Sequence, residues 1–306
     1  MNSSEIHEIQ SSANYKIIIP ISIFCALISI IISCGILMVI FLNKRLHTMA
    51  HILICNTCFT SIFYSVVQSN NYIYLIFITQ DTSDLSCRFR AYFGYLSIAA
   101  VIYSYFIQAL SRLFYSIFHR NQRWILSFKT QCIMILIQWM VVILIPLPAI
   151  LTKDIYYRPT FLCWVPKEKI LHMTYTLLVY YVIPITLIVI IYINIYYRVK
   201  YLEKNMNIKT IRKIQQNRNL EILRNILILI GIYTSGGIAT FIYITTKIEI
   251  FYSMGIVLLP LFVTIEKLMT ILLDREVRKI IKNYFCQSTT KITVIVRNQN
   301  HLVRQN

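Results

Sequence analysis

Side chains that carry out catalysis or bind metals are scattered through this sequence rather than grouped. It has no glycine-rich phosphate-binding loop and no clustered pair of carboxylates of the kind that performs acid–base chemistry. None of the histidine spacings is typical of a metal site; the six residues are His7, His47, His51, His119, His172 and His301. We therefore expect a protein that is not an enzyme and that needs no metal or cofactor.

Glu266 and Lys267 have the most unusual surroundings of the charged residues, because they lie inside a long apolar segment. A charge inside a membrane is costly and usually serves a purpose. Adjacent residues on a helix do not face each other, so we do not expect these two side chains to neutralise one another. The simplest interpretation is that Lys267 extends to the cytoplasmic surface while Glu266 faces a small hydrated cavity.

Arg112 ends another apolar segment. Between Arg90 and Arg112, 21 consecutive residues carry no charge. A helix rises about 1.5 Å per residue, so a helix of this length crosses the ~30 Å hydrocarbon core of a bilayer. Arg112 then lies at a membrane surface, where an arginine with no special task is common. Its position alone assigns it no role.

The composition predicts an integral membrane protein. Hydrophobic residues make up 57% of the 306 residues and charged residues only 14%, and the mean hydropathy is +0.63. Soluble domains carry about a quarter charged residues. We predict an all-α protein and expect Ser69-Asn70-Asn71 to close its second span. Seven membrane-spanning helices are assigned, at residues 17–42, 50–67, 91–118, 131–151, 173–197, 222–245 and 251–273.

The distribution of positive charge predicts the orientation. The net charge is +18, and 20 of the 30 lysines and arginines lie on the side that holds the C-terminus, against 8 on the other side. Positively charged loops stay in the cytoplasm, so the N-terminus is predicted to lie outside. The charge is therefore a topology signal, and we expect no nucleic-acid partner.

Two of the eight cysteines, Cys87 and Cys163, are the only ones that this topology places on the outer, oxidising side. They can pair in one way, and the alternative is two free thiols. Asn2, in Asn2-Ser3-Ser4, lies on the same side and fits the glycosylation pattern. Cys286 lies near the inner surface, where we expect palmitoylation.

From about residue 35 to residue 286 the layout resembles the rhodopsin-like G-protein-coupled receptors. Cys87 and Cys163 match the family's cysteines at the outer end of helix three and in the second outer loop. Arg112 matches the arginine of its Asp-Arg-Tyr motif, and Tyr192 matches the tyrosine that swings toward this arginine in active receptors. Further structural markers of the fold are Asn56, Trp139 and Pro184.

The resemblance implies a seven-transmembrane helix bundle with four parts. Residues 1–16 form an extracellular tail, residues 17–273 the transmembrane receptor domain, residues 274–286 a short amphipathic eighth helix, and residues 287–306 a cytoplasmic tail. The function implied is that of a plasma-membrane receptor that transmits the binding of an extracellular ligand to a heterotrimeric G protein. The basic loop at residues 198–224 also favours contact with membrane lipid.

The sequence departs from the family at its activation motifs. Ser111 replaces the aspartate before the arginine, which removes a restraint on the resting state and predicts more basal activity. Ser61 stands where helix two usually carries an aspartate. Glu266 is expected opposite Ser61, so we hypothesise that the carboxylate has moved to helix seven. Gly236-Gly237 is the only feature able to kink span six.

The expected ligand follows from the outer ends of the spans. Gly94 stands where amine receptors keep an aspartate, so a peptide or an uncharged small molecule is expected in place of an amine. Tyr95, Tyr180 and Tyr181 are candidates to line the pocket, although interfacial tyrosines are also common in membrane proteins. Two alternative functions remain open. One is a receptor relic that binds ligand or pairs with another receptor without coupling, and the other is a seven-span carrier or channel.

Overall fold

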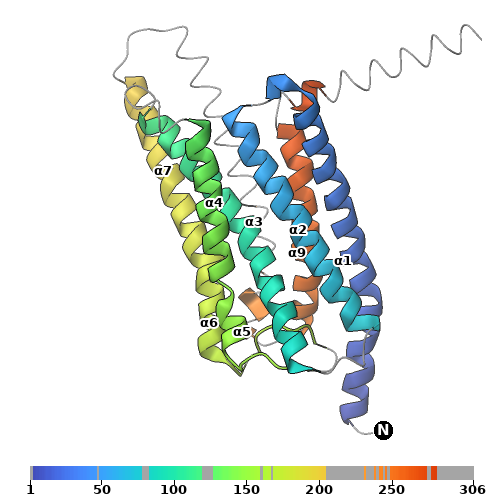
Figure 1. The fold of residues 1–306 in the computed structure, drawn as a ribbon. Coiled ribbons are helices and arrows are strands. Elements are labelled where there is room, and N and C mark those ends of the chain that lie inside the picture. The colour runs from blue at the N-terminus through green and yellow to red at the C-terminus, as the bar shows by residue number, and fades with distance from the viewer. Residues whose placement is uncertain are drawn as a thin grey trace, which may run out of the picture.

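The computed structural model is a bundle of long helices that run alongside one another (Figure 1). Within the part of the chain that the structure describes, six helices are long and apolar enough to cross a membrane. The sixth of the seven predicted spans, at residues 222–245, lies almost entirely outside the described residues. These are residues 3–46, 48–77, 83–118, 127–158, 161–166, 168–204, 249–273 and 277–280, with isolated positions between 231 and 246.

Helix α3 passes through the middle of the bundle, with α1, α2 and α9 on one side and α4 and α7 on the other (Figure 1). The predicted spans agree with these helices except at their ends. The elements are α1 (Ser3–Leu42), η1 (Lys44–Leu46), α2 (Met49–Phe77), α3 (Asp84–Phe118), α4 (Phe128–Leu144), α5 (Leu147–Leu151), α6 (Ile170–Leu177), η2 (Leu178–Val182), α7 (Ile183–Lys204) and α9 (Glu249–Leu273).

The outer surface of the bundle is apolar. Large hydrophobic side chains such as Phe24, Leu136 and Ile190 are more than half exposed on α1, α4 and α7. In the central helix α3, by contrast, 72% of the most apolar stretch is buried, against 28% in α4. Such an outer surface is stable in contact with lipid and costly in water, so the fold fits a membrane.

Helix α2 continues past the point where the prediction ended it. Ser69-Asn70-Asn71 was expected to close the span, but α2 runs to Phe77. Two polar side chains near this point, Gln68 and Asn71, are buried between helices and do not end the helix. Asn71 is 7% exposed, and the Gln68 amide donates to the carbonyl of Gly94 and to the hydroxyl of Ser97 on α3. A polar side chain is tolerated within a membrane helix when a neighbouring helix satisfies it.

Pro260 in α9 explains a contact among three helices. Proline has no backbone N–H, so the carbonyl of Ile256, four residues earlier, loses its usual helical donor. The Tyr72 hydroxyl of α2 donates to this carbonyl at 3.2 Å. The Ser22 hydroxyl of α1 lies at the same distance from it and shares its proton with the Ile18 carbonyl of its own helix, at 2.9 Å. Both side chains are almost fully buried. The free carbonyl that the proline creates therefore becomes the point at which α1, α2 and α9 join.

Pro184 has a comparable effect on the fifth span. Directly before it, the turn at η2 (Leu178–Val182) is a π-helix, in which the N–H of Ile183 donates to the carbonyl of Leu178. A π-helical turn holds one more residue than an α-helical turn and lets the chain accommodate a missing donor. Tyr180 and Tyr181 lie on this widened turn.

We predict that removing both hydroxyl donors to the Ile256 carbonyl destabilises the bundle. An interhelical hydrogen bond in a membrane contributes about 0.6 to 2 kcal/mol, so the double variant Ser22→Ala/Tyr72→Phe should lose roughly 1–3 kcal/mol and melt at a lower temperature in detergent. Tyr196→Phe is the control, because the Tyr196 side chain is 48% exposed on the lipid-facing side of α7. An unchanged Tm in the double variant would contradict this role of the carbonyl.

Candidate functional site

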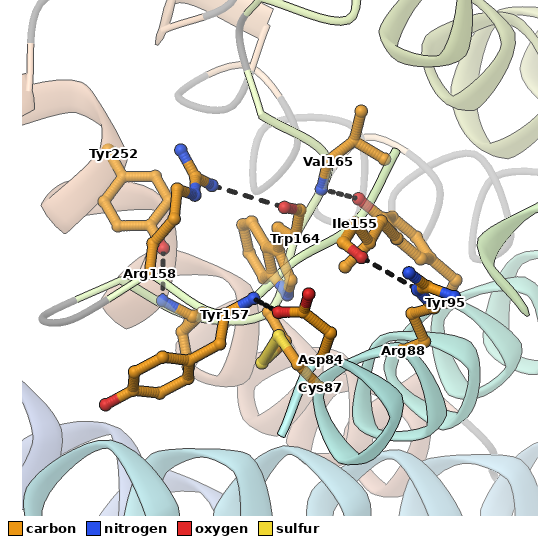
Figure 2. The surroundings of a disulfide bond; sticks show 12 residues. Asp84, Cys87, Arg88, Tyr95, Ile155, Tyr157, Arg158, Trp164, Val165 and Tyr252 are labelled. Atoms are coloured by element: carbon orange, nitrogen blue, oxygen red, sulfur yellow. Dashed lines mark hydrogen bonds between the residues drawn. A yellow bond between two sulfur atoms is a disulfide. The ribbon is translucent and has the colours of Figure 1, made fainter. Parts of the chain in front are cut away.

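A disulfide joins the outer end of α3 to the loop between α5 and α6. It links Cys87 to Cys163 with their Cα atoms 5.3 Å apart (Figure 2). Cys87 is fully buried among Ala91, Ala149 and Ile155. The loop is thereby fixed at the mouth of the bundle.

Three hydrogen bonds hold the same loop on α3 (Figure 2). The Arg88 side chain donates to the carbonyl of Ile155, and the N–H of Tyr157 donates to the carboxylate of Asp84. The N–H of Val165 donates to the Tyr95 hydroxyl at 3.1 Å. With the disulfide, these bonds place the loop as a fixed wall over the outer end of the bundle.

Beneath this loop lies a cleft of about 690 Å³, counting the open space at its mouth. Its described walls come mainly from α3, the loop, α6, η2 and α9, and most of the lining residues are aromatic or aliphatic. Tyr95, Tyr180 and Tyr181, the three tyrosines proposed from the sequence, all line it, together with Trp164 and Tyr252. Ligand sites are usually concave and mostly apolar with a few polar groups, so this cleft is the candidate ligand site.

Gly94 is not among the described residues that line the cleft. It faces α2 instead, where a Cβ atom on Gly94 would lie 3.2 Å from the Asn71 side-chain nitrogen and 3.8 Å from that of Gln68. The proposal of Gly94 as a pocket residue therefore needs correction. Its small size serves the close approach of α2 and α3.

Arg158 lines the cleft and was not singled out from the sequence. Its Nη2 atom donates to the carbonyl of Trp164 at 3.3 Å, and its guanidinium carbon lies 5.1 Å from the centre of the Phe161 ring. Its Nε atom is buried and makes no hydrogen bond among the described residues. The available sequence signal was that Arg158 lies five residues before Cys163, so the disulfide carries it to the mouth of the cleft.

The acidic residue Asp154, in the same loop, pairs with two residues outside the cleft lining. Its carboxylate lies 3.1 Å from the Lys169 ammonium and 3.3 Å from the His172 ring. The hydrogen bond from Lys169 is the main reason that the pKa of Asp154 is below its usual range. Asp154 therefore stays ionised and paired on the outer surface.

Asn56, Gln138 and Trp139 form a polar contact at the centre of the bundle. The Asn56 amide donates to the Gln138 side-chain oxygen at 2.7 Å, and its own oxygen accepts from the Trp139 indole at 3.2 Å. Gln138 also donates to the carbonyl of Ala100 on α3. The two sequence markers Asn56 and Trp139 thus contact each other, and Gln138, which the sequence did not single out, joins α4 to both α2 and α3.

Lys267 and Glu266 form a buried ion pair, which corrects the expectation that they would not neutralise one another. The Lys267 nitrogen lies 3.0 Å from one Glu266 oxygen, and the exposed fractions of the two residues are 0% and 2%. The expectation failed because both side chains are long enough to bend into one space between helices, where no water competes. Lys267 does not extend to the cytoplasm.

The contacts of this pair reach α2 through Lys267. The ammonium donates to the carbonyl of Thr57 at 3.2 Å, and Thr270, one turn further along α9, donates to Glu266. The Ser61 hydroxyl is buried and makes no hydrogen bond among the described residues. The described polar link between α9 and α2 at this level is therefore a lysine bound to a backbone carbonyl. The placement of the Glu266 carboxylate opposite Ser61 stays a prediction.

Arg112 and Tyr192 approach each other at the inner end of the bundle. Tyr192 on α7 is 3% exposed, and it lies close enough to Arg112 for the arginine's charge to act on its hydroxyl. Ser111 and Arg112 are both half-buried on α3. The Tyr192 hydroxyl is buried and makes no hydrogen bond among the described residues, so the joint role of Arg112 and Tyr192 stays a prediction.

Comparison with protein families adds one finding. Residues 33–253 match the family model described as 7 transmembrane receptor (rhodopsin family). The chain belongs to this family. Comparison with curated proteins finds no significant match. Family membership makes the chain a multi-pass membrane receptor with a seven-transmembrane bundle, and this family is generally non-enzymatic.

Several features proposed for the receptor lie outside the described residues: Asn2, Gly236, Gly237, Cys286 and residues 274–276. Residues 277–280, where the eighth helix was expected, are helical. Val277 packs with Ile36, Ile40 and Leu46, and Arg278 donates to the carbonyl of Leu272. This segment is therefore held against α1 and the end of α9.

We predict that breaking the ion pair is more damaging than removing it. Lys267→Met leaves an unpaired buried carboxylate, and Glu266→Gln an unpaired ammonium. Each change should cost about 3–5 kcal/mol of stability, whereas Glu266→Gln/Lys267→Met should recover most of this loss. The measurement is a double-variant cycle on the thermal unfolding and membrane yield of the receptor.

The exposed pair between Lys169 and Asp154 supplies the matched control. Lys169→Met removes the same kind of contact where Lys169 is 47% exposed, so it should cost less than about 1 kcal/mol. Equal losses in the single and double variants of the buried pair would contradict the prediction. If Glu266→Gln changed neither yield nor basal signalling, Glu266 would have no functional role.

Proposed function

We propose that this receptor acts in the plasma membrane, with its N-terminus outside, and transmits the binding of an extracellular ligand to a heterotrimeric G protein. The observation that carries the proposal is that the outer cleft and the inner arginine share two helical segments. Tyr95 and Arg112 lie near opposite ends of α3. Along the fifth span, Tyr181 on η2 lies beside the cleft and Tyr192 lies further toward the inner side, on α7.

The link between these two sites passes through the π-helical turn before Pro184. A ligand that moves Tyr180 and Tyr181 acts on this turn, and α7 carries the displacement to Tyr192 beside Arg112. Transmission of this kind needs two arrangements of the helices that ligand and G protein both bias. Ser111 leaves Arg112 without an adjacent carboxylate, which favours the arrangement that contacts the G protein.

The chemistry of the cleft supports a ligand that is not an amine. Among the described residues lining it there is no carboxylate to bind an ammonium group. The proposed division of the chain places the extracellular tail at residues 1–16, the receptor domain at 17–273, the eighth helix at 274–286 and the cytoplasmic tail at 287–306. Asn2 is proposed as a glycosylation site and Cys286 as a palmitoylation site that fixes the eighth helix to membrane lipid.

The test is ligand-free G-protein activation in cells, comparing the native receptor with Arg112→Ala at matched surface expression. A charge-assisted hydrogen bond contributes about 1.5–3 kcal/mol. Loss of such a bond between Arg112 and the G protein should therefore reduce the basal signal roughly tenfold or more. Arg278→Ala is the control, because Arg278 is an exposed arginine that, among the described residues, donates to the carbonyl of Leu272.

A basal signal that is equal in the native receptor and Arg112→Ala would contradict coupling through this arginine. It would favour the alternative of a receptor that binds ligand, or pairs with another receptor, without activating a G protein.

A further inference from the structure

The outer cleft carries one positive charge and, among its described lining residues, no negative one. Arg158 is the single charged side chain in that set, and the rest are aromatic, aliphatic or hydroxylated. A cation in an apolar cleft is favourable only when something pairs with it, because the surroundings solvate charge poorly. The charge pattern of the cleft therefore calls for an anionic partner.

The Arg158 guanidinium is held in place by contacts that leave some of its N–H groups able to donate to a ligand. It lies beside the rings of Phe161 and Tyr156, at 5.1 and 5.9 Å, and gives one N–H to the Trp164 carbonyl. A guanidinium has five N–H groups, and the Nε group of Arg158 is buried with no hydrogen-bond acceptor among the described residues. Figure 2 shows the group between Tyr252 and Trp164 with this single dashed contact.

Nearby carboxylates on the described outer surface do not serve Arg158. Asp84 accepts the N–H of Tyr157, and Asp154 is paired with Lys169 and His172. Glu168 is exposed. The positive charge at the cleft is thus left for a molecule that enters it.

Two tyrosines provide further donors. The hydroxyls of Tyr95 and Tyr252 each accept a backbone N–H from the loop, from Val165 and Leu162 respectively. Because the oxygen is the acceptor in both bonds, each O–H proton remains available to donate to an anion.

We propose that the cleft binds a carboxylate attached to an aromatic or apolar body, with Arg158 as its anchor. The proposal rests on the function proposed above and replaces the sequence-based expectation of an uncharged ligand. A carboxylate matches the planar donor fork of arginine and carries one charge. A phosphate monoester carries nearly two charges, and a single guanidinium in an apolar cleft would leave it half neutralised. The carboxylate belongs either to a small organic acid or to the C-terminus of a peptide.

The test uses probes that differ only in charge. Full-length receptor in detergent at pH 7.4 and constant ionic strength is melted with 3-phenylpropionate, indole-3-acetate or N-acetyl-Ala-Ala-Phe, and with the primary amide of each. At least one acid should raise the Tm by roughly 2–4 °C at a concentration tenfold above its Kd, while its amide has no such effect. A response to the aryl acids indicates a small organic acid, and a response to the peptide alone indicates a peptide C-terminus.

Variants assign the effect to Arg158. Arg158→Gln should abolish the response to the acid, and Arg158→Lys, which keeps the charge but not the fork, should retain part of it. Arg90→Gln is the matched control, because Arg90 is an arginine of the same part of α3 that lies over the Tyr74 ring, 4.6 Å from its centre, and does not appear among the described lining residues. The Tm of each variant without probe shows whether it folds.

Three results would overturn the proposal: no acid of the set shifts the native Tm, each amide matches its acid, or Arg158→Gln keeps the full response. None of these measurements involves a G protein. A failure here is therefore separate from a failure of coupling at Arg112, which is measured without ligand.

Discussion

The absence of water inside a bilayer is the constraint on which this structure depends most. A buried polar group can find its partner only in the protein, and several of those partners lie on neighbouring helices. The Ile256 carbonyl joins α9 to α1 and α2, the Lys267 ammonium joins α9 to α2, and Gln138 joins α4 to α3. Apolar packing alone discriminates poorly among helix arrangements in lipid, because lipid tails are as apolar as leucine. These polar contacts therefore do much to determine which helices meet and in which register.

The two ends of the receptor differ in how they are held. The outer end is fixed by the disulfide from Cys87 and by hydrogen bonds from the loop to α3, so the wall of the cleft is set before a ligand arrives. At the inner end, Arg112 and Tyr192 lie on the adjacent helices α3 and α7, and no disulfide joins the described helices there. A rigid outer wall and a less constrained inner end suit a molecule in which binding at one end selects the arrangement at the other.

Much of the fold could be predicted from the sequence, because span length, charge asymmetry and the Cys87–Cys163 pair are set by the chain and the membrane. Tyr95, Tyr180 and Tyr181, which the sequence offers as pocket candidates, line the cleft. What failed depends on neighbours that a single sequence does not display. Asn71 ends no helix because α3 faces it, and Lys267 and Glu266 pair because the bundle closes around them. Arg158 reaches the cleft only because the disulfide folds its loop inward.

The π-helical turn at Leu178–Val182 also affects how the chain tolerates changes in length. Each residue of an α-helix advances the rotation by about 100°. The extra residue in this turn therefore determines the direction in which the side chains of α7 point. Deleting one residue here would let the fifth span become a regular helix and would rotate Tyr192 away from Arg112, with the outer tyrosines left in place. The turn therefore sets the rotation of the helix after it relative to the helix before it. An insertion or deletion in this short segment would therefore disturb the fifth span more than a substitution would.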